Sequence, residues 1–384
     1  MNAERLHELC VEVKNAVGEA SLVPSMDRVA ANLGNLASQP QNSDFQRELS
    51  TSLSALYEIL SVFPTDAYSP AWREVLEEIG AADVLGERLA DRVREIVEQH
   101  QITPATAQEE VLAVVQELGQ VVNAMDNVIS GFSVFHIARD VLAPGECEVG
   151  VLIPRTAVDD GFAEFVDELR DFQFIFSHFG ELVDADEASL QVRTISSSDL
   201  MVFLAAAPGL CALIAKAAKD LTDTYKNLLD IKEKRHELKD LGLSGRALKG
   251  VDAHANRLMD DRIEALAIEI VQTHYEVSDD GRKNELVNGI RISLRKLANK
   301  IDRGFNIEVR AEPLSADEDD DSDASETDTL ANHIQIVMEA SKALRFIKTD
   351  GEPILHLPES NDEHQETESD KQGEDRPGDE ANPD

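Results

Sequence analysis

Side chains that commonly carry out catalysis are scattered along this chain rather than grouped. The three cysteines, Cys10, Cys147 and Cys211, are odd in number and far apart, so they predict neither a disulfide framework nor a metal site. His236 precedes Glu237, but the second histidine of a zinc-protease motif is missing. The glycine-rich phosphate-binding loops are missing as well. We therefore expect no cofactor and no specific metal ion.

An enzyme is kept as the alternative interpretation. Ser196–Ser198 has the composition of a turn, and no neighbouring residue would activate a hydroxyl group there. Cys147 lies between two glutamates, whose negative charge disfavours a thiolate, and Cys211 lies in apolar surroundings. Neither cysteine is expected to be a nucleophile. Catalytic groups converge in space rather than in sequence, so the enzymatic alternative places a pocket where a small sheet meets a long helix.

The most distinctive local charge pattern is a basic segment at residues 282–303, which has seven bases and two acids. Its apolar residues recur at helical spacing, so we expect an amphipathic helix with exposed basic edges. The candidate contact residues on those edges are Arg291 with Arg295, and Lys296 with Lys300 and Arg303. Three roles fit this helix: a solvated face that balances acidic neighbours, a docking face for an acidic partner or the chain's own tail, and a nucleic-acid contact. The last is the least favoured because the aromatic residues that stack on bases are missing.

The charge of the whole chain also disfavours nucleic acid. The formal net charge is −39, of which residues 1–200 hold −23 and residues 316–384 hold −17, whereas residues 201–315 are nearly neutral. A chain of this charge repels a phosphate backbone at long range. Solubility is the simplest explanation of the excess acid. The alternative is a specific role, in which the acidic tail covers the basic helix and screens it from competing polyanions.

Two acidic stretches are expected outside the folded elements. Residues 316–328 are expected to form an acidic linker. Residues 358–384 have too few apolar side chains to form a folded structure and are expected to be disordered. The linker places carboxylates at several positions of a calcium-binding loop. However, Ser322 stands where the loop needs glycine, and Asp328 stands where it needs the longer glutamate. We therefore expect no calcium site.

Six of the thirteen phenylalanines lie between residues 162 and 179. Most of them follow one helical stripe, which is typical of a helix that packs on a sheet, although a ligand pocket is the alternative. Phe174 is off the stripe and is therefore a candidate interface residue.

The periodicity of the sequence predicts the elements that position these residues. Residues 1–138 have apolar stripes at helical spacing, with helix starts at Ser43, Ser69-Pro70 and Thr103-Pro104. Residues 139–207 predict a small unit of strand, helix, strand and strand. The fold class that we expect is α+β and predominantly α-helical, with a helical N-terminal region, a small mixed β-sheet with a covering helix, long helices and an acidic disordered tail.

Residues 208–315 predict long helices and one further strand. Pro208 begins a helix that continues to about Leu241, and two more helices follow before a strand at 305–310 that could return to the small sheet. In the first of these helices, Leu221 and Leu228 are expected to face a partner helix, either internal or from another chain. One further amphipathic helix is expected within residues 329–357, from Asn332 to Lys348.

The apolar run at residues 200–215 is too short to span a bilayer and is interrupted by Pro208, so it predicts buried core. The N-terminus has no apolar signal region, which favours a cytoplasmic protein. The interpretation we favour is a non-catalytic interaction or regulatory protein, whose partner is another protein or a second copy of this chain in a homo-oligomer. No membrane and no nucleic acid are expected as partners.

Overall fold

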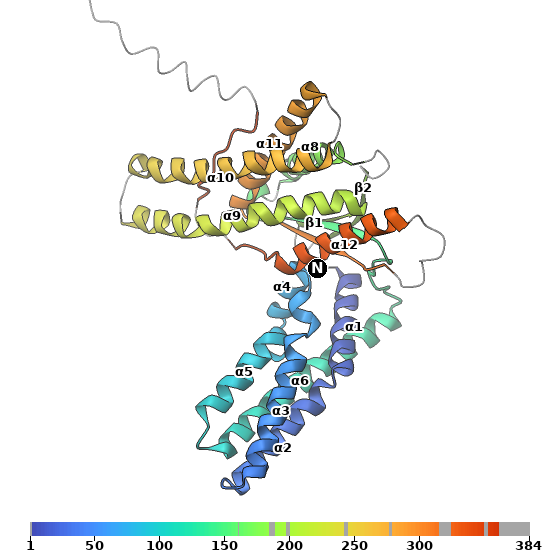
Figure 1. The fold of residues 1–384 in the computed structure, drawn as a ribbon, viewed down its shortest axis with the longest axis vertical. Helices are drawn as coiled ribbons and strands as arrows, with labels where there is room; N and C mark the ends of the chain where they lie inside the picture. The colour runs from blue at the N-terminus through green and yellow to red at the C-terminus, as the bar shows by residue number, and fades with distance from the viewer. Residues whose placement is uncertain are drawn as a thin grey trace, which may run out of the picture. The chain divides into compact units, whose positions relative to one another are not determined.

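The computed structural model describes residues 2–159, 161–183, 189–196, 200–241, 245–275, 279–314, 324–348 and 352–360. Figure 1 shows a predominantly helical chain with one small sheet, which confirms the predicted α+β class. The chain divides into two compact units. Unit 1 consists of Met1–Gly150, Val192–Ala205 and Glu308–Phe346. Unit 2 consists of Val151–Gln191, Ala206–Ile307 and Ile347–Asp384.

Unit 1 contains the N-terminal helices and also α12 (Ala324–Ala343). The N-terminal helices form a bundle in which α2 packs against both α3 and α6. They are α1 (Ala3–Glu19), α2 (Leu22–Ser38), α3 (Ser43–Ser61), α4 (Pro70–Glu78), α5 (Gly86–Gln99) and α6 (Pro104–Val134). Proline occupies the first position of α4 and of α6, as the sequence predicts. The cap of α3 is one residue earlier than expected, because the side chain of Asn42 accepts the hydrogen bond from the Asp44 N–H. One continuous core joins these helices through fully buried side chains such as Leu9, Leu56 and Val111.

The sheet has four strands in the order β2-β3-β1-β4. They are β1 (Cys147–Ile153), β2 (Leu190–Ser196), β3 (Leu200–Ala206) and β4 (Asn306–Ala311). The chain runs β1-α8-β2-β3-α9 and reaches β4 only after the long helices, which is the connectivity of the split β-α-β plait. The sheet is therefore antiparallel rather than mixed. The prediction that the last strand returns to the sheet is confirmed, because β4 pairs with β1.

The helices of unit 2 pack around α11. They are α7 (Arg155–Val158), α8 (Phe162–Gly180), α9 (Pro208–Asp240), α10 (Gly245–His274) and α11 (Asp280–Asp302). Figure 1 shows α9 and α10 side by side as a long hairpin, and α11 packs against α8, α9 and α10. Leu221 and Leu228 are 0% and 2% exposed, so the partner that their stripe predicts lies within the chain itself.

The C-terminal helix differs from its predicted bounds. Helix α12 (Ala324–Ala343) begins inside the segment expected as an acidic linker and ends before Lys348. Beyond its end, the side chain of Asn306 fixes Ile347 outside the helix: its Oδ1 accepts the Ile347 N–H at 2.7 Å, and its Nδ2 donates to the Ile347 carbonyl at 3.3 Å. Residues 361–384, which include most of the predicted disordered tail, lie outside the described residues.

The apolar run at 200–215 divides into β3 and the first turns of α9, where it is largely buried. No helix within the described ranges combines the length and the hydrophobicity that a bilayer crossing requires.

Candidate functional site

The predicted basic helix is α11, and two of its five candidate residues are buried rather than exposed. Arg295 is 4% exposed, and its guanidinium donates to both carboxylate oxygens of Asp260 on α10, at 2.7 and 2.9 Å. Lys300 is 3% exposed, and its Nζ lies 2.7 Å from Asp171 on α8 and forms a second ion pair with Glu168. The expectation that these two bases lie on exposed edges is wrong. Helices α8 and α10 cover those edges and supply the acids that balance them.

The other three candidate bases are partly or largely exposed but also have partners in unit 2. Lys296 Nζ lies 3.1 Å from carboxylate oxygens of both Asp171 and Glu359. Arg303 Nη2 lies 2.9 Å from Glu168, and Arg291 donates to Asn288. These pairings favour the role in which the basic helix balances acidic neighbours within the fold.

These contacts set the acidity of the groups around Lys296. Burial alone would raise the pKa of Asp171, but hydrogen bonds from Lys300 and Lys296 outweigh burial and lower that pKa. Burial alone would lower the pKa of Lys296, but Glu359 and Asp171 outweigh it and raise that pKa. Phe174 is 37% exposed, and Lys296 Nζ lies 5.7 Å from the centroid of its ring. Phe174 is therefore partly covered by its own chain.

An extended segment of unit 2, which we call the strap (residues 352–359), crosses the long helices. Asp302 Oδ2, at the end of α11, accepts the N–H groups of Ile354 and Leu355 at 2.5 and 2.6 Å. The side chain of Asn256 on α10 accepts the N–H of His356 at 2.6 Å and donates to the carbonyl of Ile354 at 3.0 Å.

Asn299 on α11 completes this set. Its Oδ1 accepts the N–H of Leu357 at 3.0 Å, and its Nδ2 donates to the carbonyl of Leu357, also at 3.0 Å. We call Asn256, Asn299 and Asp302 the strap clamp. Together they bond the backbone N–H of four consecutive residues, 354–357, so they hold an extended chain regardless of its side chains.

The side chains of the strap contribute apolar burial in the middle and charge at the ends. Ile354, Leu355 and Leu357 are 0%, 3% and 4% exposed. At one end Glu352 lies 2.5 Å from Lys239 on α9. At the other end Glu359 pairs with Lys296 and accepts a hydrogen bond from Asn299 at 2.8 Å.

Asp302 is the best-connected member of the clamp. Its side chain is fully buried, and its Oδ1 accepts hydrogen bonds from the Tyr225 hydroxyl at 2.6 Å and from Lys232 Nζ at 3.0 Å. Burial raises the pKa of the Tyr225 hydroxyl, and the adjacent carboxylate of Asp302 raises it further. Tyr225 therefore remains a hydrogen-bond donor, which fixes the carboxylate that receives the strap.

Sequence reasoning missed the strap clamp. Asparagines on a predicted helix are usually interpreted as surface residues, so Asn256 and Asn299 did not stand out. The one available signal for the clamp was Asp302, an acid at the end of a basic helix.

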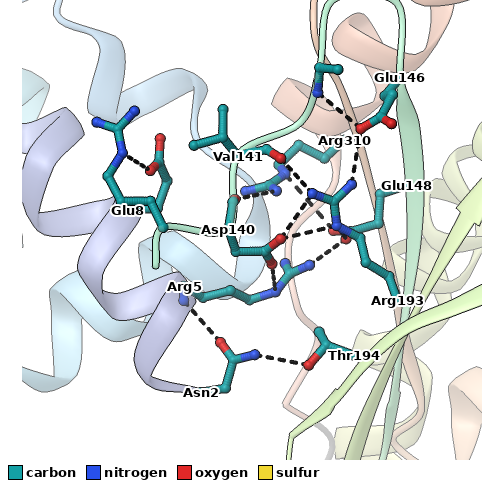
Figure 2. Close-up of polar contacts among 12 residues, drawn as sticks. Asn2, Arg5, Glu8, Asp140, Val141, Glu146, Glu148, Arg193, Thr194 and Arg310 are labelled. Atoms are coloured by element: carbon teal, nitrogen blue, oxygen red, sulfur yellow. Dashed lines mark hydrogen bonds and ion pairs between the residues drawn. The ribbon is translucent and has the colours of Figure 1, made fainter. Parts of the chain in front are cut away.

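A second polar site lies in unit 1, and we call it the buried charge network (Figure 2). Its members are Arg5, Asp140, Glu148, Arg193, Glu308 and Arg310. Arg5, in the first turn of α1, is 1% exposed; its Nε lies 2.9 Å from Asp140, and its Nη2 pairs with Glu148 on β1. The guanidinium carbon of Arg5 also lies 3.3 Å from the centroid of the Phe203 ring. This guanidinium therefore joins α1 to the sheet.

The remaining members come from the other strands. Arg193 on β2 lies 3.0 Å from Asp140 and 3.5 Å from Glu148, and Arg310 on β4 lies 3.9 Å from Glu148. Burial raises the pKa of Glu308 on β4, although Arg5 opposes this shift. Because buried charges are costly to desolvate, this network stabilises the fold only while each charge keeps its partners. Gly150 on β1 leaves space for it: a Cβ there would lie 2.7 Å from the Glu308 side chain.

The three cysteines are members of neither site, although Cys147 directly precedes Glu148 on β1. Cys10, Cys147 and Cys211 are all buried, and burial raises the pKa of Cys10 to about 11. Among the described residues, no group of three or more His, Cys, Asp or Glu side chains is arranged to hold a metal ion. The tract tested for a calcium loop lies mostly outside those residues.

Comparison with known protein families, with curated protein sequences and with solved structures gives no match to this chain.

Proposed function

We propose that this chain is a non-catalytic interaction protein whose unit 2 binds an extended peptide at the site that its own strap occupies. The partner segment has an apolar-apolar-x-apolar core, as in Ile354–Leu357, with a carboxylate beyond each end. The observation that supports this proposal most directly is the strap clamp. Three side chains of α10 and α11 hold the backbone of the strap, which is how a protein recognises an extended chain.

Charge complementarity supports the acidic ends of the partner. Lys239 and Lys296, from α9 and α11, each pair with a glutamate of the strap, at 2.5 and 3.1 Å. The Glu352 side chain is largely exposed, at 63%, and the Glu359 side chain is partly exposed, at 41%. Exposed pairs contribute little affinity, so they orient the peptide, while burial of three apolar side chains supplies most of the binding energy.

In the resting chain the strap competes with the partner. The strap is covalently tethered, so its effective concentration at the site is on the order of millimolar. A partner peptide displaces the strap when its own concentration exceeds a threshold. That threshold is the effective concentration of the strap divided by the ratio of the partner's affinity to the strap's affinity. The acidic tail that follows the strap would then act as a screen for the remaining bases, as proposed from the sequence. A second copy of the chain could donate its own strap, which would make the same site a self-assembly contact.

The test uses a chain that ends at Lys348 and a fluorescent peptide that copies residues 352–360. We expect saturable binding to the shortened chain, and binding to the full-length chain that is at least about tenfold weaker because its own strap competes. The control peptide carries Leu355→Asp and Leu357→Asp and should not bind. Circular dichroism establishes that the shortened chain is folded.

If the shortened chain does not fold, the full-length Asn256→Ala, Asn299→Ala variant replaces it, because loss of the clamp side chains frees the strap without removing it. This variant should release residues 352–360 to a protease faster than the native chain does. Failure of a folded shortened chain to bind the peptide, or equal binding of the control peptide, would contradict the proposal. Light scattering at two concentrations separates self-assembly from binding to another protein.

A further inference from the structure

Unit 1 contains a cavity of about 440 Å³ that no part of the proposed function uses. Its walls come from α1, the segment 64–69 and the start of α4 that follows it, the segment 139–142, the end of β4 with the residues after it, and α12. This volume falls within the range of small-molecule sites, which is roughly 300–1,000 Å³. Four carboxylates line it, namely Glu8, Glu12, Asp140 and Glu312, together with the bases Arg139, Arg310 and Lys342.

Most of these charges already have partners. Arg139 Nε lies 3.1 Å from Glu8 Oε2. Asp140 is held by two arginines of that network. Arg310 lies over the Trp72 ring, 5.2 Å from its centroid, and Lys342 is exposed at the mouth.

Glu12 and Glu312 differ from the other carboxylates. In the part of the chain that the structure describes, no base lies within ion-pair distance of either side chain. Burial raises the pKa of Glu312, and the negative charge of Glu12 adds to the shift while the charge of Arg310 opposes it. Burial also raises the pKa of Glu8, and there Glu12 adds to the shift while Arg139 opposes it. Among the described residues, Glu12 and Glu312 are therefore the carboxylates of this cavity that have no ion-pair partner.

The aromatic wall of the cavity has polar groups that lack partners. Tyr68 and Trp72 meet edge to face, with ring centroids 5.2 Å apart. Ser69 and Trp72 are 4% and 7% exposed, and among the described residues the Ser69 Oγ and Trp72 Nε1 atoms have no hydrogen-bond partner. Buried polar groups that remain unpaired are destabilising, and a ligand or water in the cavity usually supplies the missing partner.

We propose that this cavity binds a small organic cation, an ammonium group carried on an apolar body. The ammonium lies between Glu12 and Glu312, where it compensates their charge. The apolar body lies against the rings of Tyr68 and Trp72, which exclude water from it. An anion is disfavoured because the negative charges of Glu12 and Glu312 repel it. A metal ion is disfavoured because it has no apolar surface that could contact Tyr68 and Trp72.

The experiment is isothermal titration calorimetry of the full-length chain with phenethylamine, which carries an ammonium on an aromatic body. Phenethyl alcohol and phenylpropionate, of similar shape but neutral and negative, are the matched ligands. We expect heat of binding from the amine alone. Glu12→Gln should weaken the amine at least about tenfold, because a charge-assisted hydrogen bond is lost. Glu19→Gln, an exposed glutamate of the same helix outside the cavity, should leave it unchanged.

Each other outcome overturns the inference. No heat from the amine would mean that the cavity does not take an organic cation. Equal binding of the alcohol would mean an apolar site without charge recognition, and tighter binding of the acid would mean an anion site built on Arg310 and Lys342. Competition by calcium or magnesium ions with the same affinity would assign the carboxylates to a metal. Thermal unfolding of Glu12→Gln shows whether that variant is folded. If it is not, the titrations of the native chain with the amine, the alcohol and the acid still test the inference.

Discussion

Asn299 forms a closed pair of hydrogen bonds with the backbone of Leu357: its carboxamide oxygen accepts the N–H and its carboxamide nitrogen donates to the carbonyl, both at 3.0 Å. A neighbouring strand in a sheet would satisfy the same two groups. Here a side chain of α11 takes the place of a strand, and the peptide that it holds belongs to the same chain. This relationship is the basis of the function that we propose for unit 2.

Replacing Asn299→Ala should release the end of the strap. The substitution leaves the N–H and the carbonyl of Leu357 without their partners, and we expect a local destabilisation of about 1–3 kcal/mol. Limited proteolysis should cut residues 352–360 faster than in the native chain. The control is Asn227→Ala on α9, whose side chain bonds only within its own helix. Unchanged proteolysis of Asn299→Ala would show that the apolar side chains alone hold the strap.

Replacing Arg5→Met should be strongly destabilising. The substitution leaves Asp140 and Glu148 with fewer partners in a buried setting, and breaking a buried ion pair in this way costs about 3–5 kcal/mol. Urea unfolding measures the loss. Arg94→Met is the matched control, because Arg94 is exposed and pairs with Asp91 within its own helix. A loss for Arg5→Met no larger than that of the control would mean that the network adds little to stability.

The lowered pKa of Asp171 predicts a dependence of stability on pH. Because the folded state holds this pKa below its usual value of 3.8, Asp171 stabilises the fold above that value. The contribution is lost as the pH falls through the lower, folded pKa. The difference in unfolding free energy between the native chain and Asp171→Asn should therefore be constant from pH 7 to about 5 and shrink below about pH 4. A difference that does not change with pH would contradict the role of its lysine partners.

The cysteines should react slowly. Cys10, Cys147 and Cys211 are each 2% exposed or less, and the pKa of Cys10, about 11, keeps its thiol protonated at neutral pH. We expect iodoacetamide to label them only as fast as the chain opens, and denaturant to accelerate the reaction. Rapid stoichiometric labelling of the native chain would instead indicate an activated thiol, and with it the enzymatic alternative.

The features that could be predicted from the sequence are those determined by residues that are neighbours along the chain. The stripe that includes Leu221 and Leu228 predicts a helix because its period of 3.6 is local, and Pro70 and Pro104 mark helix starts because a first-turn residue needs no N–H partner. The strand after α11 was predicted for the same reason. Whether a stripe faces its own chain or a partner is not local, and only the fold shows that it is internal.

Neither polar site could be predicted, because its members are far apart in the sequence. Arg5 and Glu148 are 143 residues apart, and Asn256 and His356 are 100 residues apart. The exposure predicted for Arg295 and Lys300 failed for a related reason: a basic stripe shows where charges lie on a helix but not which acidic helices will cover it. The period of a helix identifies its buried apolar face, whereas ion pairs depend on tertiary neighbours.

The central claim is that the strap leaves its site while the rest of unit 2 stays folded, and native-state hydrogen exchange tests it most directly. The amides of residues 354–357, all bonded to the strap clamp, should exchange through a local opening. Their opening free energy should be at least about 2 kcal/mol below that of the buried α11 amides at Leu294 and Leu297. Equal protection of the strap and of α11 would mean that the strap opens only when the unit unfolds, and would contradict the account.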